Sequence, residues 1–246
     1  MTSRIALSRV CLEAAIALLL PCILARAEEL VNRQSQAAGS GVLGEQQIIA
    51  AMIDHNQARS DALFEYTAGR TYRVSQPNGK VHAQVDGVME FHAPDRKRFV
   101  VTSEQGSGLV RRLALKPLIA TEIKTAAGKD RHDSAITPAN YRFELLGEET
   151  VRNYRCYVLR AFPRRVDKYL FEGKLWVDEG DFAVVRMEGR PAANLSFWIK
   201  RAEFVREYQR VDGFWLPMKD ETEVEVRIYG KKILTIDHRD YTVRGG

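Results

Sequence analysis

The chain has 246 residues, of which 45% are hydrophobic and 28% are charged. This composition is that of a globular protein and excludes a chain that is disordered throughout. The formal net charge is +5, and part of this charge lies in the N-terminal segment. The positive charge on the other residues is too small to indicate nucleic-acid binding.

Residues 1–27 have the three-part organisation of a secretory signal peptide. Arg4 and Arg9 form a short positive region, and an apolar run over residues 14–24 follows it. Small residues then stand at the two positions that a signal peptidase reads, the second of which is Ala27. We therefore expect export and cleavage after Ala27.

Two alternatives to cleavage after Ala27 stay open. An uncleaved anchor is one, although the apolar run is short of the roughly 20 residues that span a bilayer. A lipidated signal ending at Cys22 is the other, and Pro21 in front of the cysteine fits it poorly. Cleavage leaves Cys156 as the one cysteine, which excludes an intrachain disulfide and suits a bacterial envelope protein.

Residues 28–44 are polar and small, and they are typical of a flexible leader ahead of a single domain over residues 45–246. An amphipathic helix is predicted over residues 45–59, because apolar residues such as Ile48 and Met52 recur there at helical spacing. We expect its apolar stripe to pack on the dry face of a sheet.

The remainder predicts about ten antiparallel strands in succession, separated by hairpin turns and one helical insertion. The strands are expected at residues 63–75, 80–92, 97–103, 141–146, 154–162, 168–177, 182–188, 196–208, 214–229 and 232–243. Asn78 and Gly79 favour a tight turn. Gly87 indicates a β-bulge at which the alternation of side chains changes parity.

The clearest strand pattern lies in residues 221–229. Val224, Val226 and Ile228 point one way and the charged residues between them point the other way. Such alternation indicates an antiparallel sheet that is covered on one side only. The predicted fold class is a β-rich α+β fold, in which a curved antiparallel half-barrel, an incomplete β-barrel, is covered by helices.

The helical insertion is predicted over residues 107–127, where Pro117 is expected to kink or split the helix. Its apolar residues are the candidates for a lid over the sheet: Leu109, Leu113, Leu118 and Ile119. A plain cover for the core is an equally good interpretation of the same pattern.

Catalytic motifs are missing from the sequence. The five histidines are scattered, and no nucleophile elbow, phosphate loop or dinucleotide fingerprint occurs. Cys156 is expected to pack as a small hydrophobe. We therefore expect no enzyme activity, no cofactor and no metal, and a hydrolase that uses Cys156 is a minor alternative. The basic clusters 96–98 and 164–165 are solvated loop ends or points of peripheral membrane contact.

Three segments carry a family resemblance. Residues 173–178 form a strand that ends in Trp-Val-Asp, and after an acidic turn residues 182–189 continue with Val-Val-Arg-Met-Glu. Residues 214–217 read Phe-Trp-Leu-Pro before an alternating strand. This pattern resembles the central hairpin of LolA-like outer-membrane lipoprotein-sorting proteins, and the resemblance extends over residues 45–243.

The resemblance implies a curved, incomplete barrel closed by helices, whose apolar cavity holds the acyl chains of lipoproteins or related lipids in the periplasm. Dedicated carriers of the family have an arginine directly before the proline that ends the second strand. Ala93 precedes Pro94 at that place here, so the resemblance implies lipid binding more strongly than a transporter-loaded shuttle.

The predicted function is an exported periplasmic carrier or binder of lipid or lipoprotein acyl chains. The candidates for the cavity wall are aromatic: Trp176, Phe197, Trp198, Phe214 and Trp215. The alternative is an envelope sensor or scaffold that uses the same fold to bind a protein partner. Packing into a solid core is the ordinary role of such aromatic residues.

Overall fold

The computed structural model describes residues 43–125 and 134–246. Glu45–Gly246 forms one compact unit, and the described helices and strands belong to it. The predicted signal peptide and most of the predicted leader lie outside the described residues. No helix in the described part of the chain is long and apolar enough to cross a membrane.

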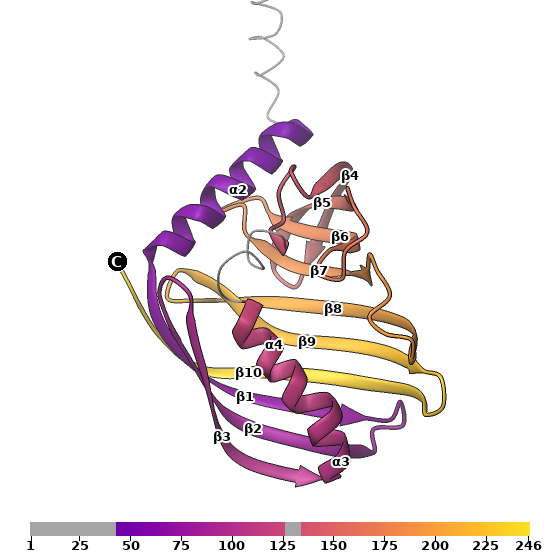
Figure 1. The fold of residues 1–246 in the computed structure, drawn as a ribbon. Coiled ribbons are helices and arrows are strands. Elements are labelled where there is room, and N and C mark those ends of the chain that lie inside the picture. Colours follow the sequence, from indigo (N-terminus) through magenta and orange to yellow (C-terminus); the bar gives the residue numbers. More distant parts are fainter. Residues whose placement is uncertain (1–42, 126–133) are drawn as a thin grey trace, which may run out of the picture. The chain divides into compact units, whose positions relative to one another are not determined.

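Ten strands form a single antiparallel sheet, as predicted. They are β1 Leu63–Ser75, β2 Val81–His92, β3 Arg96–Gly106, β4 Tyr141–Val151, β5 Tyr154–Pro163, β6 Phe171–Asp178, β7 Val184–Pro191, β8 Ile199–Val211, β9 Phe214–Val226 and β10 Gly230–Gly245. Their order in the sheet is β3-β2-β1-β10-β9-β8-β7-β6-β5-β4. The sheet stays open, with β3 and β4 as its edges (Figure 1). This open antiparallel sheet confirms the half-barrel fold class.

The topology is a meander with one long-range pairing. Strands that follow one another in the chain are neighbours in the sheet, except that β3 is connected to β4 across the whole width. The first and last strands, β1 and β10, pair from Leu63↔Gly245 to Ser75↔Ile233. This pairing places the first and last strands, β1 and β10, in the interior of the sheet rather than at its edges.

Two predicted turn features are confirmed. Gly79 has a φ of +84°, and its N–H donates to the Gln76 carbonyl at 2.9 Å, as the Asn-Gly pair requires. The pairing of β2 with β3 shifts between Asp86 and Gly87, so the bulge is present. The predicted change of parity is wrong, however, because buried residues continue on the same parity from Val85 to Met89.

The bounds of β1 agree with the prediction and those of the other strands differ from it by one to five residues, with two differences that matter for the candidate residues. β9 ends at Val226, so Ile228 is exposed in the turn to β10 rather than aligned with Val224. β8 begins at Ile199, so Phe197 and Trp198 precede the strand. The backbone explains the first difference, because Gly230 has a φ of +65° and starts the return strand at once.

The helices are α2 Glu45–Ala62, α3 Gly108–Val110, the π-helical turn η1 Arg111–Leu115 and α4 Lys116–Thr125. The insertion stays helical through Pro117 and is not split there, but its hydrogen-bond pattern changes just before the proline. Lys116 donates its N–H to the carbonyl of Arg111, five residues back, immediately before the proline that has no N–H to donate.

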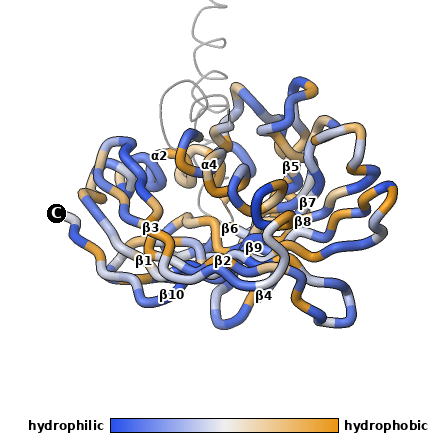
Figure 2. The backbone as a smooth tube through the Cα atoms, turned by 60° about the horizontal axis from the view of Figure 1, so that its bottom comes forward, coloured by the Kyte–Doolittle hydropathy of each residue, from blue (hydrophilic) through white to orange (hydrophobic). Residues whose placement is uncertain are grey.

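Both longer helices cover the same side of the strands, as Figure 2 shows for α2 and α4. The first residue of α2, Glu45, accepts a hydrogen bond from the Leu145 N–H at 2.9 Å, and Arg59 near its end donates to the Asp181 carbonyl at 2.8 Å. Ile48, Ile49 and Met52 form the buried stripe of α2 between these contacts. The predicted packing of the first helix against the sheet is therefore observed.

Candidate functional site

The helix-covered face of β1, β2 and β10 is apolar where α4 crosses it (Figure 1). The side chains that form this cluster are Tyr72, Val74, Ala83, Val85, Leu115, Ile119 and Ile236, all of them buried. Leu118 and Ile123 of α4 pack against the cluster from the helix. This contact is the apolar part of the attachment between α4 and the sheet.

A buried ion pair supplies the polar part of that attachment. Arg70 of β1 is only 1% exposed, and its Nη1 forms an ion pair with Oε1 of Glu122 on α4. Tyr72 donates its hydroxyl to Oε2 of Glu122 at 2.7 Å, and Lys97 of β3 lies 3.6 Å from Oε1. Three strand residues thus hold one carboxylate of the covering helix, and we call Arg70, Tyr72, Lys97 and Glu122 the latch.

The latch keeps Glu122 ionised. Burial by itself raises the pKa of the Glu122 carboxyl, but the charges of Arg70 and Lys97 and the hydrogen bonds from Arg70 and Tyr72 outweigh it and lower the pKa to about 2. The same surroundings raise the pKa of the Tyr72 hydroxyl, with burial as the main cause. At neutral pH the latch therefore consists of one carboxylate, two cations and a neutral phenol.

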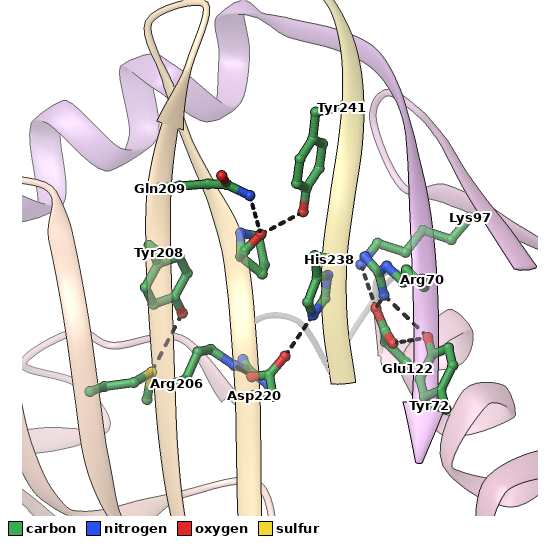
Figure 3. Close-up of polar contacts among 12 residues, drawn as sticks. Arg70, Tyr72, Lys97, Glu122, Arg206, Tyr208, Gln209, Asp220, His238 and Tyr241 are labelled. Carbon is green, nitrogen blue, oxygen red and sulfur yellow. Dashed lines mark hydrogen bonds and ion pairs between the residues drawn. The ribbon is translucent and has the colours of Figure 1, made fainter. Parts of the chain in front are cut away.

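A second polar cluster lies beside the latch on the same face. Arg70 pairs across strands with His238 of β10, and His238 Nε2 lies 2.9 Å from Oδ2 of Asp220 on β9. Asp220 also forms an ion pair with Arg206, its cross-strand partner on β8. Figure 3 shows the row of polar side chains that results, from Tyr208 to Tyr72. A band of charge thus crosses an otherwise apolar face.

The protonation states in the second cluster follow from its surroundings. Burial lowers the pKa of His238, so its imidazole is neutral at pH 7. Its Nε2 then donates to the Asp220 carboxylate, while Nδ1 is buried without a hydrogen-bond partner. Burial raises the pKa of Asp220, but Arg206 and His238 outweigh it and lower the pKa to about 2. Glu122 and Asp220 are therefore ionised and paired at neutral pH, unlike a general acid, whose pKa lies near the working pH.

Acid is expected to destabilise the protein through these two carboxylates. Their pKa of about 2 lies below the value of roughly 4 that they have in an unfolded chain, so the stabilisation is complete above about pH 5 and is lost as the pH falls towards 2. Urea denaturation at a series of pH values measures the effect. Glu122→Gln should flatten the decrease in unfolding free energy between pH 5 and pH 2. Glu144→Gln, which changes an exposed carboxylate of β4, should leave the slope as in the wild type; equal slopes for both variants would contradict the assignment.

The structure separates the five predicted wall aromatics into three places. Trp176 is buried in a cluster with Cys156, Val158 and Val185, and Trp215 packs against that cluster from β9. Phe214 packs instead against the cluster of Tyr66, Ala68, Met89 and Leu216. Phe197 and Trp198 are exposed ahead of β8. Trp176 and Trp215 are brought together in one cluster, and the rings of Phe197 and Trp198 contact each other outside it.

The four lid candidates divide along the insertion. Leu118 and Ile119 of α4 face the sheet in the apolar cluster described above. Leu109 of α3 and Leu113 of the π-helical turn are exposed. The insertion therefore presents Leu109 and Leu113 to solvent, whereas Leu115, Leu118 and Ile119 pack on the sheet.

Cys156 is buried and unpaired, as predicted. Burial raises the pKa of its thiol to about 11, so it is a poor nucleophile at neutral pH. No cluster of histidine, cysteine and carboxylate side chains that could hold a metal ion is found among residues 43–125 and 134–246. What the described face offers chemically is apolar contact and fixed charge.

Two surface hollows are lined by described residues near β6, β7 and β8. The larger, of about 750 Å³, includes Arg164, Arg190 and Leu195 in its lining. The smaller, of about 520 Å³, includes Gly173, Gly189 and Phe204. None of the nine predicted wall and lid residues lines either of these two hollows.

Reasoning from the sequence missed the charged residues of the helix-covered face. A signal was present, because Arg70 occupies the same strand parity as the buried Ala68 and Tyr72. Glu122 likewise follows Leu115 and Ile119 at helical spacing, on the face that packs on the sheet. A charge in phase with an apolar stripe predicts a buried partner on the opposite element.

Comparison with known proteins gives similarity at low identity. A family model described only as an uncharacterized protein matches residues 129–244, and no curated protein matches the chain. Among solved structures, the chain is similar to a DUF1329 family protein from Desulfovibrio piger, with 14% identity, 82% of this chain and 93% of that chain covered, and a TM-score of 0.44.

Two further solved structures bear on the predicted resemblance. A putative outer membrane lipoprotein-sorting protein domain from Vibrio parahaemolyticus is 13% identical, with 79% and 92% of the two chains covered and a TM-score of 0.41. A LolA superfamily protein from Nitrosomonas europaea is 12% identical, with 83% and 96% covered and a TM-score of 0.35. The structures to which the chain is similar thus include one described as a lipoprotein-sorting domain and one described as a LolA superfamily protein.

Proposed function

We propose that this chain is an exported, non-catalytic binding protein of the bacterial periplasm, which holds the acyl chain of a lipid or lipoprotein against the helix-covered face of its sheet. The observation that carries the proposal is the attachment of α4. The helix rests on an open sheet through a small apolar contact, the buried latch and a more exposed ion pair of Lys116 with Glu104 of β3. A cover attached in this way can lift without unfolding the strands beneath it.

The hydrophobic effect supplies the reason for such a cover. An acyl chain in water costs about 0.8 kcal/mol for each exposed methylene group, so a long chain needs an apolar site while it crosses an aqueous compartment. The apolar residues under α4 can exchange contact with the helix for contact with a guest. The free energy of removing the helix is then offset by burial of the guest.

The latch fits a cover that opens and closes. When α4 lifts, Arg70, Lys97 and Glu122 return to water, where each ion is solvated well. Reclosure restores the ion pair in one geometry, because Tyr72 and Arg70 bind different oxygens of the same carboxylate. The latch therefore fixes the position of the closed cover and contributes only a modest net free energy to closure.

Leu109 and Leu113 are proposed as the residues that meet the guest first, because they are exposed on the same insertion that carries α4. Leu118 and Ile119 would line the closed site from the helix, and Phe214 and Leu216 from the neighbouring cluster. Trp176 and Trp215 would stabilise the sheet behind them.

Native mass spectrometry of the protein purified from its own cells tests the proposal. We expect a species heavier than the polypeptide by the mass of one lipid, which organic extraction removes. After extraction, Leu109→Ser combined with Leu113→Ser should weaken the rebinding of a long-chain fatty acid about tenfold, from the loss of apolar contact. Leu146→Ser, at an exposed leucine of β4, should leave rebinding unchanged. A polypeptide that carries no lipid and binds no added fatty acid would refute the proposal.

A protein partner remains the second candidate function. The edge strands β3 and β4 each run for 11 residues, and each has a neighbouring strand on one side only. An extended peptide can add to such an edge through main-chain hydrogen bonds. Recovery of a stoichiometric envelope protein without lipid in the same mass spectra would favour this candidate.

A further inference from the structure

Two connections of the sheet meet at one end of the molecule (Figure 1). The N–H of Arg227, in the turn from β9 to β10, donates to the Trp198 carbonyl at 2.9 Å, just ahead of β8. The Arg227 side chain donates to the Phe197 carbonyl at 2.6 Å, and its guanidinium lies 4.8 Å from the centre of the Phe197 ring. The two connections are therefore held together by specific contacts and project as one unit.

This unit presents large apolar side chains to solvent. Phe197 is 73% exposed, Trp198 54%, Ile228 68% and Tyr229 70%. The rings of Phe197 and Trp198 contact each other edge to face with centroids 5.4 Å apart, so the exposed surface is ordered. We call these four residues the aromatic tip. Soluble proteins seldom expose four such side chains together unless the surface binds something.

The surroundings of the aromatic tip are basic. Residues 195–201 and 226–232 contain five lysines and arginines and no aspartate or glutamate; the basic residues are Lys200, Arg201, Arg227, Lys231 and Lys232. Lys200, Arg201 and Lys231 pair with Glu225, Glu203 and Glu223, which lie behind the tip on β9 and β8. Arg227 and Lys232 donate to backbone carbonyls, and neither pairs with a carboxylate of the described residues. A positive charge therefore stays at the base of the tip.

At the opposite end of the sheet, the connections and the strand ends beside them carry both signs of charge: Asp95 is followed by Arg96, and Arg152 lies at the same end as Glu179 and Asp212. The aromatic tip differs from that end in combining exposed aromatic residues with basic residues and no carboxylate of its own. This combination is the one that tryptophan, tyrosine and basic residues show at the interface of a bilayer.

We infer that the aromatic tip is a docking surface for a membrane that contains anionic phospholipids. Phe197, Trp198 and Ile228 enter the headgroup region, Tyr229 keeps its hydroxyl in contact with water, and Arg227 and Lys232 meet lipid phosphates. Docking positions the protein at a bilayer whether or not a lipid occupies the helix-covered face, so it is independent of the proposed function.

Vesicle flotation of the protein purified from its own cells tests the inference. We expect binding to vesicles of phosphatidylethanolamine with one quarter phosphatidylglycerol, weaker binding to phosphatidylcholine vesicles, and release by salt. Phe197→Ser combined with Trp198→Ser should reduce the partition coefficient about tenfold, and Lys232→Gln should reduce it about fivefold on the anionic vesicles alone. Tryptophan emission should shift to the blue on binding, and Trp198→Phe should abolish the shift, because Trp176 is buried and Trp215 is half-buried.

Phe64→Ser is the matched control, because Phe64 is 52% exposed on β1 and lies outside the aromatic tip. It should leave vesicle binding unchanged. Absence of wild-type binding to anionic vesicles, or equal losses for Phe64→Ser and for the double variant, would overturn the inference. A protein that dimerises through the tip and becomes monomeric in the double variant, without binding vesicles, would overturn it as well.

Discussion

Arg70→Met is expected to lower the free energy of unfolding by about 3–5 kcal/mol, because it removes the main cation from a buried ion pair and leaves Glu122 without that charge. For a unit of this size the change corresponds to a decrease in Tm of roughly 6–20 °C. Thermal and urea denaturation followed by circular dichroism measure both quantities. The loss comes mainly from the ionised Glu122, which Lys97 and Tyr72 alone stabilise incompletely.

Arg73→Met is the matched control for this prediction. Arg73 lies on the same strand, three residues further along, and its ion pair with Asp237 is about one-third exposed on both sides. Exposed pairs of this kind contribute about 0–1 kcal/mol, so the control should be nearly as stable as the wild type. An equal decrease in the free energy of unfolding for Arg70→Met and Arg73→Met would show that the buried ion pair of the latch stabilises the protein no more than an exposed pair does.

A second variant separates stability from the role of the latch. Replacement of both partners, Arg70→Met with Glu122→Leu, also removes the carboxylate that the single variant leaves buried without its main partner. Such exchanges often restore stability. Under the proposed function, this double variant should fold and still bind a fatty acid, while its free energy of unfolding loses the acid dependence that Glu122 gives. The comparison therefore tests the latch even if Arg70→Met fails to fold.

The strands could be predicted from the sequence because their signals are local. Alternation fixes which side chains face the helices, and Gly79 marks a turn by its own conformation. The bounds of β1 agree with the prediction for this reason. The pairing of β1 with β10 joins residues about 180 apart in the chain, and no local pattern reports it.

The candidate site was harder to predict, because hydrophobicity alone does not say whether a side chain is buried or exposed, or which cluster it joins. Phe214 and Trp215 are neighbours in sequence, yet strand geometry sends them to different clusters. Phe197 and Trp198 look equally core-like in sequence, and they are exposed because β8 begins after them. Arg70 was missed because it is a charged residue among the buried positions of its strand. A buried charge is stable only with a partner, and the sequence does not show where that partner lies.

The strands β6 and β7 approach closely at a pair of glycines, and substitution there is expected to have a second large effect. Gly173 of β6 lies directly opposite Gly189 of β7. A Cβ atom on Gly173 would lie 1.9 Å from the Glu188 carbonyl oxygen, and one on Gly189 would lie 2.3 Å from the Glu172 carbonyl oxygen. Both obstacles are backbone atoms, so no side-chain rotation can relieve the contact. The two strands approach closely here because neither residue has a side chain.

Gly173→Ala should therefore cost about 3 kcal/mol or more, because β6 and β7 must move apart and lose cross-strand hydrogen bonds. Gly180→Ala is the control on the same hairpin, where a Cβ atom would meet only the Asp178 carboxylate at 3.1 Å, a group that can rotate away. Urea denaturation should show a decreased midpoint for Gly173→Ala and little change for Gly180→Ala. If both variants are equally stable, close approach of the strands does not require the glycines. If only Gly173→Ala is destabilised, the close approach of β6 and β7 requires a residue without a side chain at position 173, because the obstacle there is a carbonyl oxygen of the neighbouring strand.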